Sequence, residues 1–263
     1  MLQEIGYCVV PIVLDSPLEI GNFVARQIID DIEQTSIQGR EFVLGCPGGR
    51  TPRVIFQALA QEVGKRNISL SHVNIAMMDE YVVENQGKFS NIDPAAHYSC
   101  ARFAQLEIGH PLNTAAGSAR ELKSVRIPDA QRPEEYENWL REVGIDFFIL
   151  ASGASDGHIA FNPPGSARES KTRVVEVALS TRIDNLGTFP EFKSVEDVPQ
   201  YGVTVGIDTI ASLSKRVVMV MHGKHKKKAV SELLKRRAYD SDWPASVFFE
   251  CANRQLVIDN EAN

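Results

Sequence analysis

The sequence predicts an α/β fold in which a mostly parallel sheet is covered by helices on both faces. Short apolar runs alternate with helical patterns along the whole chain, as in parallel sheets joined by helices. The 263 residues, 43% of them hydrophobic, suffice for a sizeable core. No repeat, Gly/Ser linker or change in composition divides the chain, so we expect a single domain over residues 1–263.

Six apolar runs predict buried strands. They are residues 41–44, 73–78, 146–151, 202–205, 217–221 and 255–258. In sheets of this kind, ligands bind beyond the carboxyl ends of the strands. The polar residues that follow the runs are therefore the first candidates for a functional site.

Three apolar faces at helical spacing predict helices between the strands. A capping Ser16, a Pro at position 17 and Glu19 mark the start of the first helix. The faces are Ile20, Val24, Ile28 and Ile32; Ile55, Leu59 and Val63 after Thr51-Pro52; and Ala229, Val230, Leu233 and Leu234 within residues 226–237. Two long polar segments, 84–96 and 183–200, are expected to be either active-site loops or ordinary surface excursions.

The charge balance argues against nucleic acid as a general partner. Lys and Arg number 28 against 34 Asp and Glu, a net charge of −6, whereas phosphate backbones attract basic surfaces. A local basic pocket remains compatible with this balance, and so does a homo-oligomer. No secretory signal or membrane span is apparent, so we expect a cytoplasmic protein that does not contact membranes.

The cysteines have no metal-binding or CxxC spacing. We expect free thiols in a reducing compartment, with no zinc site. The four residues are Cys8, Cys46, Cys100 and Cys251.

A glycine-rich turn follows the first apolar run and leads into a helix. Gly48, Gly49, Arg50 and Thr51 lie in it. Backbone N–H groups in such a turn converge on an anion, and the positive end of the helix dipole favours a phosphate there. The turn matches neither the nucleotide P-loop nor the dinucleotide fingerprint, so a tight turn without a ligand is an equally good interpretation.

Two polar clusters follow the next buried runs. Asp79 and Glu80 come after residues 73–78, where one carboxylate at the mouth of an apolar site would be a general base and its neighbour would hold the local structure. Gly153, Asp156, Gly157 and His158 come after residues 146–151, and an Asp that orients a His forms a proton shuttle. Taken alone, an Asp-Glu pair is more often the start of a solvated loop and a lone His is more often structural, but both clusters fall where this fold class places a site.

A lysine-rich stretch, residues 224–228, follows the fifth run. Most of these lysines are expected to be solvated, but Lys226, at the start of a helix, could add a charge to a bound phosphate. Together the clusters predict a pocket for a small phosphorylated molecule, with no cofactor and no metal.

The chain resembles the glucosamine-6-phosphate deaminase/isomerase and 6-phosphogluconolactonase family over nearly its whole length. The motifs are PGGRTP (47–52), MDEY (78–81), GIDFFILASGASDGHIAFN (144–162), SKTR (170–173), VPQYGVTVGIDTI (198–210) and GKHK (223–226). MDEY and DGHIAFN are characteristic of the deaminase branch, whereas GGRTP occurs in both branches. The resemblance implies a Rossmann-like three-layer α/β/α fold and a hexose 6-phosphate substrate.

The resemblance also implies residue roles. Asp79 would move a proton between C2 and C1 of the opened amino sugar, His158 would open the ring, and Asp156 would orient His158. The Gly49–Thr51 turn and Lys226 would hold the phosphate. Loss of ammonia would leave fructose 6-phosphate.

Two positions differ from the deaminase pattern. Pro163 stands where the deaminases carry a Glu that assists the His, and Gly187 stands where they carry a phosphate-binding Arg. Arg50 replaces a glycine of the deaminase turn and could compensate for the missing Arg, since a guanidinium binds phosphate through two hydrogen bonds.

Three functions therefore stay open. The first is an isomerising deaminase of a hexosamine phosphate. The second is a lactonase, in which His158 would activate water and no C2 proton would move. The third is a sugar-phosphate sensor without turnover, although no helix-turn-helix segment is apparent that would make it a transcriptional regulator.

Overall fold

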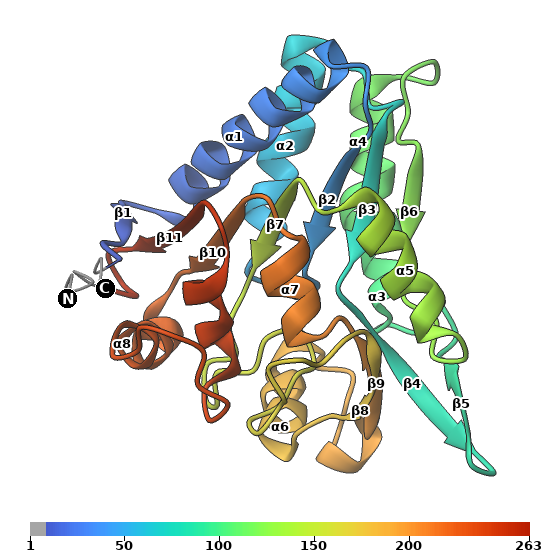
Figure 1. Ribbon diagram of the computed structural model, residues 1–263, viewed down its shortest axis with the longest axis vertical. Coiled ribbons are helices and arrows are strands. Elements are labelled where there is room, and N and C mark those ends of the chain that lie inside the picture. The colour runs from blue at the N-terminus through green and yellow to red at the C-terminus, as the bar shows by residue number, and fades with distance from the viewer. Residues whose placement is uncertain (1–8) are drawn as a thin grey trace, which may run out of the picture.

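The computed structural model describes residues 9–263 and is built on a parallel sheet of seven strands (Figure 1). The strands are β1 (Ile12–Leu14), β2 (Phe42–Cys46), β3 (Val73–Met77), β6 (Ser124–Arg126), β7 (Phe147–Leu150), β10 (Val217–Met221) and β11 (Arg254–Asp259). Their order is β1-β11-β10-β7-β2-β3-β6, and each neighbouring pair is parallel. Strands β2, β3, β7 and β10 are buried at every position, as in sheets covered on both faces.

Helices cover both faces of this sheet (Figure 1). The larger helices of one layer are α1 (Pro17–Ile37), α2 (Arg53–Arg66) and α4 (His110–Ala116), and those of the other are α5 (Pro133–Val143), α7 (Ile207–Leu213) and α8 (Lys227–Leu234). A short helix α3 (Cys100–Phe103) and a π-helical turn (Ala104–Gly109) precede α4. Two 3₁₀ turns, Lys224–Lys226 and Pro244–Glu250, flank α8. The predicted three-layer α/β/α fold is confirmed.

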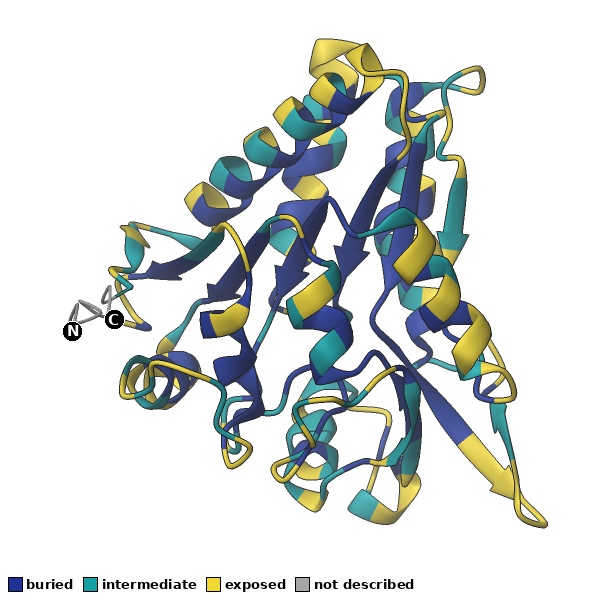
Figure 2. Cartoon of the chain, viewed as in Figure 1, coloured by how far each residue is buried: buried dark blue, intermediate teal, exposed yellow. Residues whose placement is uncertain are grey.

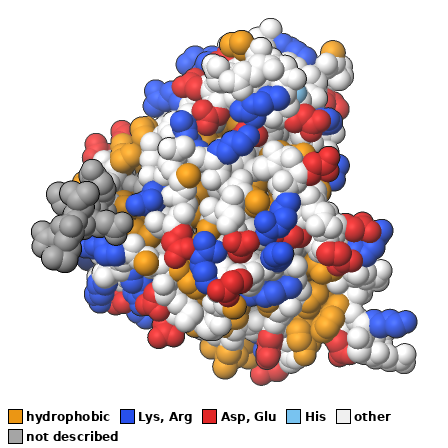
Figure 3. Space-filling model, in the orientation of Figure 1, with side chains coloured by type: hydrophobic (Ala, Val, Ile, Leu, Met, Phe, Trp, Pro, Cys, Tyr) orange, Lys and Arg blue, Asp and Glu red, His pale blue; other side chains and the backbone are white. Residues whose placement is uncertain are grey.

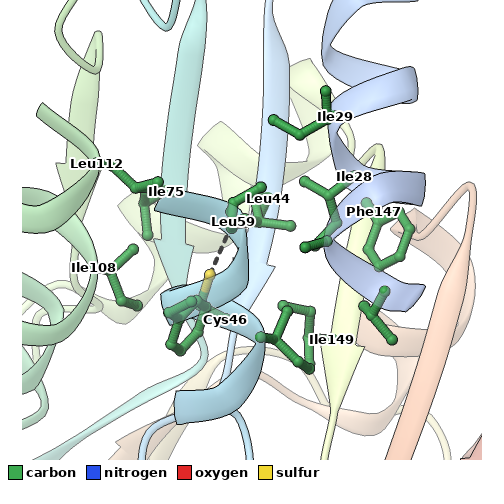
Figure 4. Packing of buried hydrophobic residues seen from close by; sticks show 14 of the residues in the cluster. Ile28, Ile29, Leu44, Cys46, Leu59, Ile75, Ile108, Leu112, Phe147 and Ile149 are labelled. Carbon is green, nitrogen blue, oxygen red and sulfur yellow. Dashed lines mark hydrogen bonds between the residues drawn. The ribbon is translucent and has the colours of Figure 1, made fainter. Parts of the chain in front are cut away.

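The core is divided by the sheet into two apolar clusters. Phe42 and Leu44 of β2 face the α1/α2 layer, whereas Val43 between them faces the α5/α7 layer. Figure 4 shows Ile28 of α1 between Leu44 of β2 and Phe147 of β7, while Ile75 of β3 lies beside Leu112 of α4. Each fully buried aliphatic side chain contributes about 1.5–3 kcal/mol, so these layers hold the strand ends in place.

The predicted helix starts and strands are largely found. Ser16 caps α1 by accepting a hydrogen bond from the Glu19 backbone N–H at 3.2 Å, and Pro17 is the first helical residue. The second predicted helix is α2, which begins at Arg53, and the third is α8, which ends at Leu234 rather than at residue 237. Cys46, Cys100 and Cys251 are free and buried, while Cys8 lies outside the described residues.

A second sheet, entirely antiparallel, was not predicted. Its order is β5 (Lys88–Asn91), β4 (Asp79–Asn85), β9 (Tyr201–Thr204) and β8 (Arg173–Glu176). The assignment of residues 202–205 to the parallel sheet was therefore wrong. The chain bends at Met78, so β4 leaves the central sheet directly after β3 and pairs with β9 instead.

The two polar segments are more ordered than a loop. Residues 84–96 contain the end of β4 and all of β5, a hairpin whose tip is exposed (Figure 2). Residues 183–200 contain most of α6 (Leu179–Thr188) and a 3₁₀ turn at Val195–Asp197. Their interpretation as loops is corrected, because backbone pairing and a helical hydrogen-bond pattern satisfy their polar groups.

The surface carries mixed charge. On the face drawn in Figure 3, Lys and Arg side chains are interspersed with Asp and Glu. Within residues 9–263, no helix combines the length and the apolar character needed to cross a bilayer.

Candidate functional site

A cavity of about 570 Å³ lies where the carboxyl ends of the parallel strands meet the antiparallel sheet. Segments that follow β2, β3, β7 and β10 line it, and α6 lines it from the side of the second sheet. Figure 1 shows β2 and β7 pointing toward α6. Eight predicted site residues line this cavity: Gly48, Gly49, Arg50, Thr51, Asp79, Gly153, His158 and Lys226. Glu80, Asp156 and Gly157 are not among its lining residues.

Asp79 is the first residue of β4 and projects into the cavity from a nearly buried position. Its side chain is 6% exposed, and burial raises the pKa of its carboxyl to about 7. The neighbouring charge of Glu80 also raises that pKa, while a hydrogen bond from the Cys100 thiol, 3.4 Å away, lowers it. A carboxylate that titrates near neutral pH is suited to general-base chemistry.

Glu80 points away from the cavity and anchors α3. Its carboxylate accepts hydrogen bonds from the backbone N–H groups of Tyr81, Cys100 and Ala101 and from the Ser99 hydroxyl, at 2.8–2.9 Å. These contacts satisfy the free N–H groups at the start of the helix. The two adjacent carboxylates thus have different surroundings, one facing the cavity and one structural.

His158 and Asp156 form the expected pair. Asp156 Oδ1 lies 2.7 Å from His158 Nδ1 and accepts the His158 backbone N–H at 3.1 Å. Burial opposes ionisation of Asp156, but the hydrogen bonds from His158 and Ser180 outweigh it, so its pKa is held well below the ordinary range. Thr181 Oγ1 also lies 2.9 Å from His158 Nδ1. Because Nδ1 is occupied in this way, Nε2 is the ring nitrogen left for a ligand.

Two glycines make room for this pair. A Cβ on Gly153 would lie 2.2 Å from His158 Nδ1. Gly157 has a φ of +68°, and a Cβ there would lie 2.2 Å from the Trp243 ring. Glycine permits both the turn and these close contacts, and Gly153 also lines the cavity.

Positive groups gather at the end of the cavity next to the α2 N-terminus. Lys226 is 9% exposed, and its Nζ donates a hydrogen bond to the Ser152 carbonyl at 2.5 Å. Burial, opposed by the charge of Asp184 and assisted by that of Arg50, lowers the pKa of Lys226 to about 8. Among the described residues, none forms a hydrogen bond or ion pair with the exposed guanidinium of Arg50. His222 Nε2 lies 3.1 Å from the Thr51 carbonyl.

Helix α6 supplies site residues that were not named individually, although most of them lie in segment 183–200, one of the two candidates for an active-site loop. Thr181, Asp184, Asn185 and Thr188 all line the cavity. Asn185 donates a hydrogen bond to the Tyr81 hydroxyl at 2.6 Å, and Asp184 accepts one from Ser155 at 3.0 Å. The spacing i, i+3, i+4, i+7 marks one helical face and was a usable signal, although the face is polar rather than apolar.

The family assignment follows from comparison with known proteins. The sequence model of the glucosamine-6-phosphate isomerases/6-phosphogluconolactonase family matches residues 15–258. The chain belongs to this family.

Similar proteins come from both branches of the glucosamine-6-phosphate isomerase/6-phosphogluconolactonase family. A glucosamine-6-phosphate deaminase of Exiguobacterium is 31% identical over 245 residues, covering 90% of this chain and 86% of that protein. The solved structure of a monomeric glucosamine-6-phosphate deaminase has a TM-score of 0.80 and 27% identity, covering 96% of this chain and 98% of the other. A 6-phosphogluconolactonase from Shewanella baltica has a TM-score of 0.68 at 17% identity, covering 95% and 97%, and shares the fold.

In this family member, the two unusual positions lie outside the cavity lining. Pro163 is not a lining residue, and its carbonyl accepts hydrogen bonds from the backbone and hydroxyl of Ser166. Gly187 is not a lining residue either, although Thr188 beside it is. A Cβ on Gly187 would meet nothing within 4 Å. The cavity is therefore built without side chains from these two positions.

Proposed function

We propose that this protein converts glucosamine 6-phosphate, or a closely related hexosamine 6-phosphate, into a ketose phosphate and ammonia. The observation that carries the proposal is a single cavity that joins Asp79, His158 and a positive end formed by Arg50 and Lys226. Deaminases among the similar proteins support the same assignment.

Ring opening is assigned to His158. The closed sugar must lose the proton of its C1 hydroxyl and gain one on the ring oxygen as the C1–O bond of the ring breaks. Nε2 of His158 is free for both transfers, and Asp156 holds Nδ1 at 2.7 Å. An ionised Asp156 also stabilises the protonated imidazole between the two steps.

Isomerisation is assigned to Asp79. Its carboxylate removes the C2 proton of the open-chain sugar and returns it to C1, which leaves an imine at C2. Water adds to C2 and ammonia leaves, so that glucosamine 6-phosphate and water give fructose 6-phosphate and ammonia. With a pKa of about 7, Asp79 is a stronger base than an exposed carboxylate and is still largely ionised at slightly alkaline pH.

The phosphate is placed at the other end of the cavity. Backbone N–H groups of the Gly48–Thr51 turn precede the N-terminus of α2, and Lys226 and Arg50 add positive charge. Binding a distant phosphate fixes the reacting carbons near Asp79, which is how remote binding energy supports catalysis.

One assay separates deamination from the lactonase alternative. Pro163 in place of the deaminase Glu favours the lactonase, whereas Tyr81 and the DGHIAFN motif favour the deaminase. Ammonia release from glucosamine 6-phosphate is expected, with no acid release from 6-phosphogluconolactone above its spontaneous hydrolysis. The opposite pattern would replace this proposal with the lactonase.

Arg50→Ala is expected to raise the KM for the phosphorylated substrate several-fold, with little change in kcat. Arg50 is exposed, so its contribution is screened by water and is smaller than that of buried Lys226. Steady-state kinetics would be compared with those of Arg53→Ala, since Arg53 pairs with Glu107 and does not line the cavity. An unchanged KM for every phosphosugar would remove Arg50 from the phosphate site.

Asp184→Asn, unlike Arg50→Ala, is expected to lower the KM for the phosphorylated substrate, by roughly fivefold. The Asp184 carboxylate lines the same cavity and interacts electrostatically with Lys226, so it repels a phosphate bound there. A nearby like charge in a partly solvated site costs on the order of 1 kcal/mol. Glu191→Gln, exposed and outside the lining, is the control and should change nothing. A raised KM would show that Asp184 instead binds the sugar.

A further inference from the structure

The thiol of Cys100 contacts the carboxylate of Asp79, which the proposed function assigns as the base of the isomerisation step. We propose that Cys100 is a positioning residue for Asp79: its S–H group holds Oδ1 and leaves Oδ2 to take the substrate proton. This inference rests on the proposed function for its catalytic consequence. The contact itself can be tested without turnover.

The geometry around the thiol is specific. Cys100 Sγ lies 3.4 Å from Asp79 Oδ1, and both residues line the cavity. Among the contacts within residues 9–263, this is the one side-chain hydrogen bond that the Asp79 carboxylate makes, although Asp79 is only 6% exposed. Buried carboxylates are costly without such donors, so the thiol supplies a contact that the base would otherwise lack.

The position of the thiol is fixed by the chain on either side. Cys100 is the first residue of α3, directly after the N-cap Ser99, and its backbone N–H donates to Glu80 Oε1 at 2.9 Å. Glu80 therefore holds in place Cys100, the residue whose thiol donates a hydrogen bond to Asp79. On the far side, a Cβ on Gly48 would lie 3.8 Å from Sγ, which places the thiol between the base and the anion-binding turn.

The thiol remains protonated in this site. Burial and the charges of Asp79 and Glu80 raise its pKa well above the ordinary value, so Cys100 acts as a donor and not as a nucleophile. A donor to a carboxylate favours the ionised form. Tyr81 on β4 and Tyr136 on α5 also lie near Asp79, but burial raises their pKa values well above 10, and both stay neutral.

The other charged groups near Asp79 are the same in the wild type and in the Cys100 variants. Besides Tyr81, the other charged or titratable groups that line the cavity are Arg50, His158, Asp184, His222, His225 and Lys226, and Glu80 adjoins Asp79 in sequence. Replacing Cys100 leaves all of them in place. A change in the titration of Asp79 would therefore report the thiol contact.

The test compares Cys100→Ala and Cys100→Ser with the wild type. Loss of the donor in Cys100→Ala is expected to move the acidic limb of the kcat/KM profile about 0.5–1 pH unit upward and to lower kcat below pH 7, because Asp79 then binds a proton more readily. Cys100→Ser retains a donor, so the acidic limb of its kcat/KM profile is expected at the same pH as in the wild type or at a lower pH. Cys251→Ala removes another buried thiol, one that does not line the cavity, and should not move the limb.

A direct titration keeps this inference separate from the proposed function. The ¹³C signal of the Asp79 carboxyl, assigned with Asp79→Asn, is followed against pH in the wild type and in both Cys100 variants. A shift in Cys100→Ala that Cys100→Ser reverses supports the contact even if no hexosamine phosphate is turned over. An unchanged Asp79 titration in Cys100→Ala, or an equal change in Cys251→Ala, overturns it. If Cys100→Ala fails to fold, the serine variant decides: a higher Asp79 pKa than in the wild type contradicts the proposal.

Discussion

Asp79→Asn is expected to reduce kcat for glucosamine 6-phosphate by about 10²–10⁴-fold, which is the usual contribution of a general base. The amide has nearly the same shape but cannot accept the C2 proton. The KM should change little, because the phosphate is held at the other end of the cavity. Release of ammonia, measured by a coupled assay, gives both constants.

The same substitution should make the protein more stable at alkaline pH. The pKa of folded Asp79, about 7, lies above its ordinary value of 3.8, so between these values the folded protein binds more protons than the unfolded chain. Stability therefore falls as pH rises from about 4 to about 7, and the whole penalty, up to about 4 kcal/mol, applies above 7. An uncharged Asn escapes this penalty.

Stability curves of the two proteins measured at pH 4 and pH 8 test this directly. The free energies of unfolding should nearly coincide at pH 4, and the Asn variant should be the more stable at pH 8. Loss of activity together with gained stability would separate a catalytic role from misfolding. Retained turnover in Asp79→Asn would remove Asp79 as the base.

The sequence was most informative where a buried strand ends in a polar residue. Asp79, His158 and Lys226 follow β3, β7 and β10, and the parallel sheet brings these three ends to one cavity. That convergence is a property of the fold class, so it could be predicted without knowing any distance. The sequence indicated that one of Asp79 and Glu80 would face the site and the other would be structural. Which one is structural depends on which carboxylate accepts hydrogen bonds from the N–H groups of α3.

Other parts of the site depend on contacts between segments far apart in the chain. Residues 202–205 look like any buried strand, and only their pairing with β4 places them in the second sheet. Cys100 carries no local signal, since its role comes from a contact across 21 positions of sequence. The cavity-lining residues of α6 have helical spacing, but they are polar, and only packing against the cavity shows that this face belongs to the site. Strand pairing and tertiary packing, rather than local propensity, decide all three.

Lys226→Met is expected to raise the KM for the phosphorylated substrate by about 10–100-fold with a much smaller effect on kcat. A charge-assisted hydrogen bond to phosphate contributes about 1.5–3 kcal/mol, and tenfold in affinity corresponds to about 1.4 kcal/mol. Lys226 is 9% exposed, so bulk water does not replace the lost contact. Methionine fills a similar volume, which keeps the surrounding packing.

Lys228→Met provides a matched control two residues away. Lys228 donates to the Ser155 carbonyl at 2.8 Å but does not line the cavity, so its loss should leave the KM nearly unchanged. A similar rise in both variants would indicate a general effect of surface charge instead of a phosphate contact.

The pH dependence gives an independent measure of the same contact. Burial lowers the pKa of Lys226 to about 8, so in the free protein its charge is lost as pH rises through 8. The kcat/KM of the wild type should therefore rise with ionisation of Asp79 near pH 7 and fall again above about 8. In Lys226→Met the alkaline fall should disappear while the acidic limb stays in place. An alkaline fall that persists in this variant would assign the phosphate to a different cation.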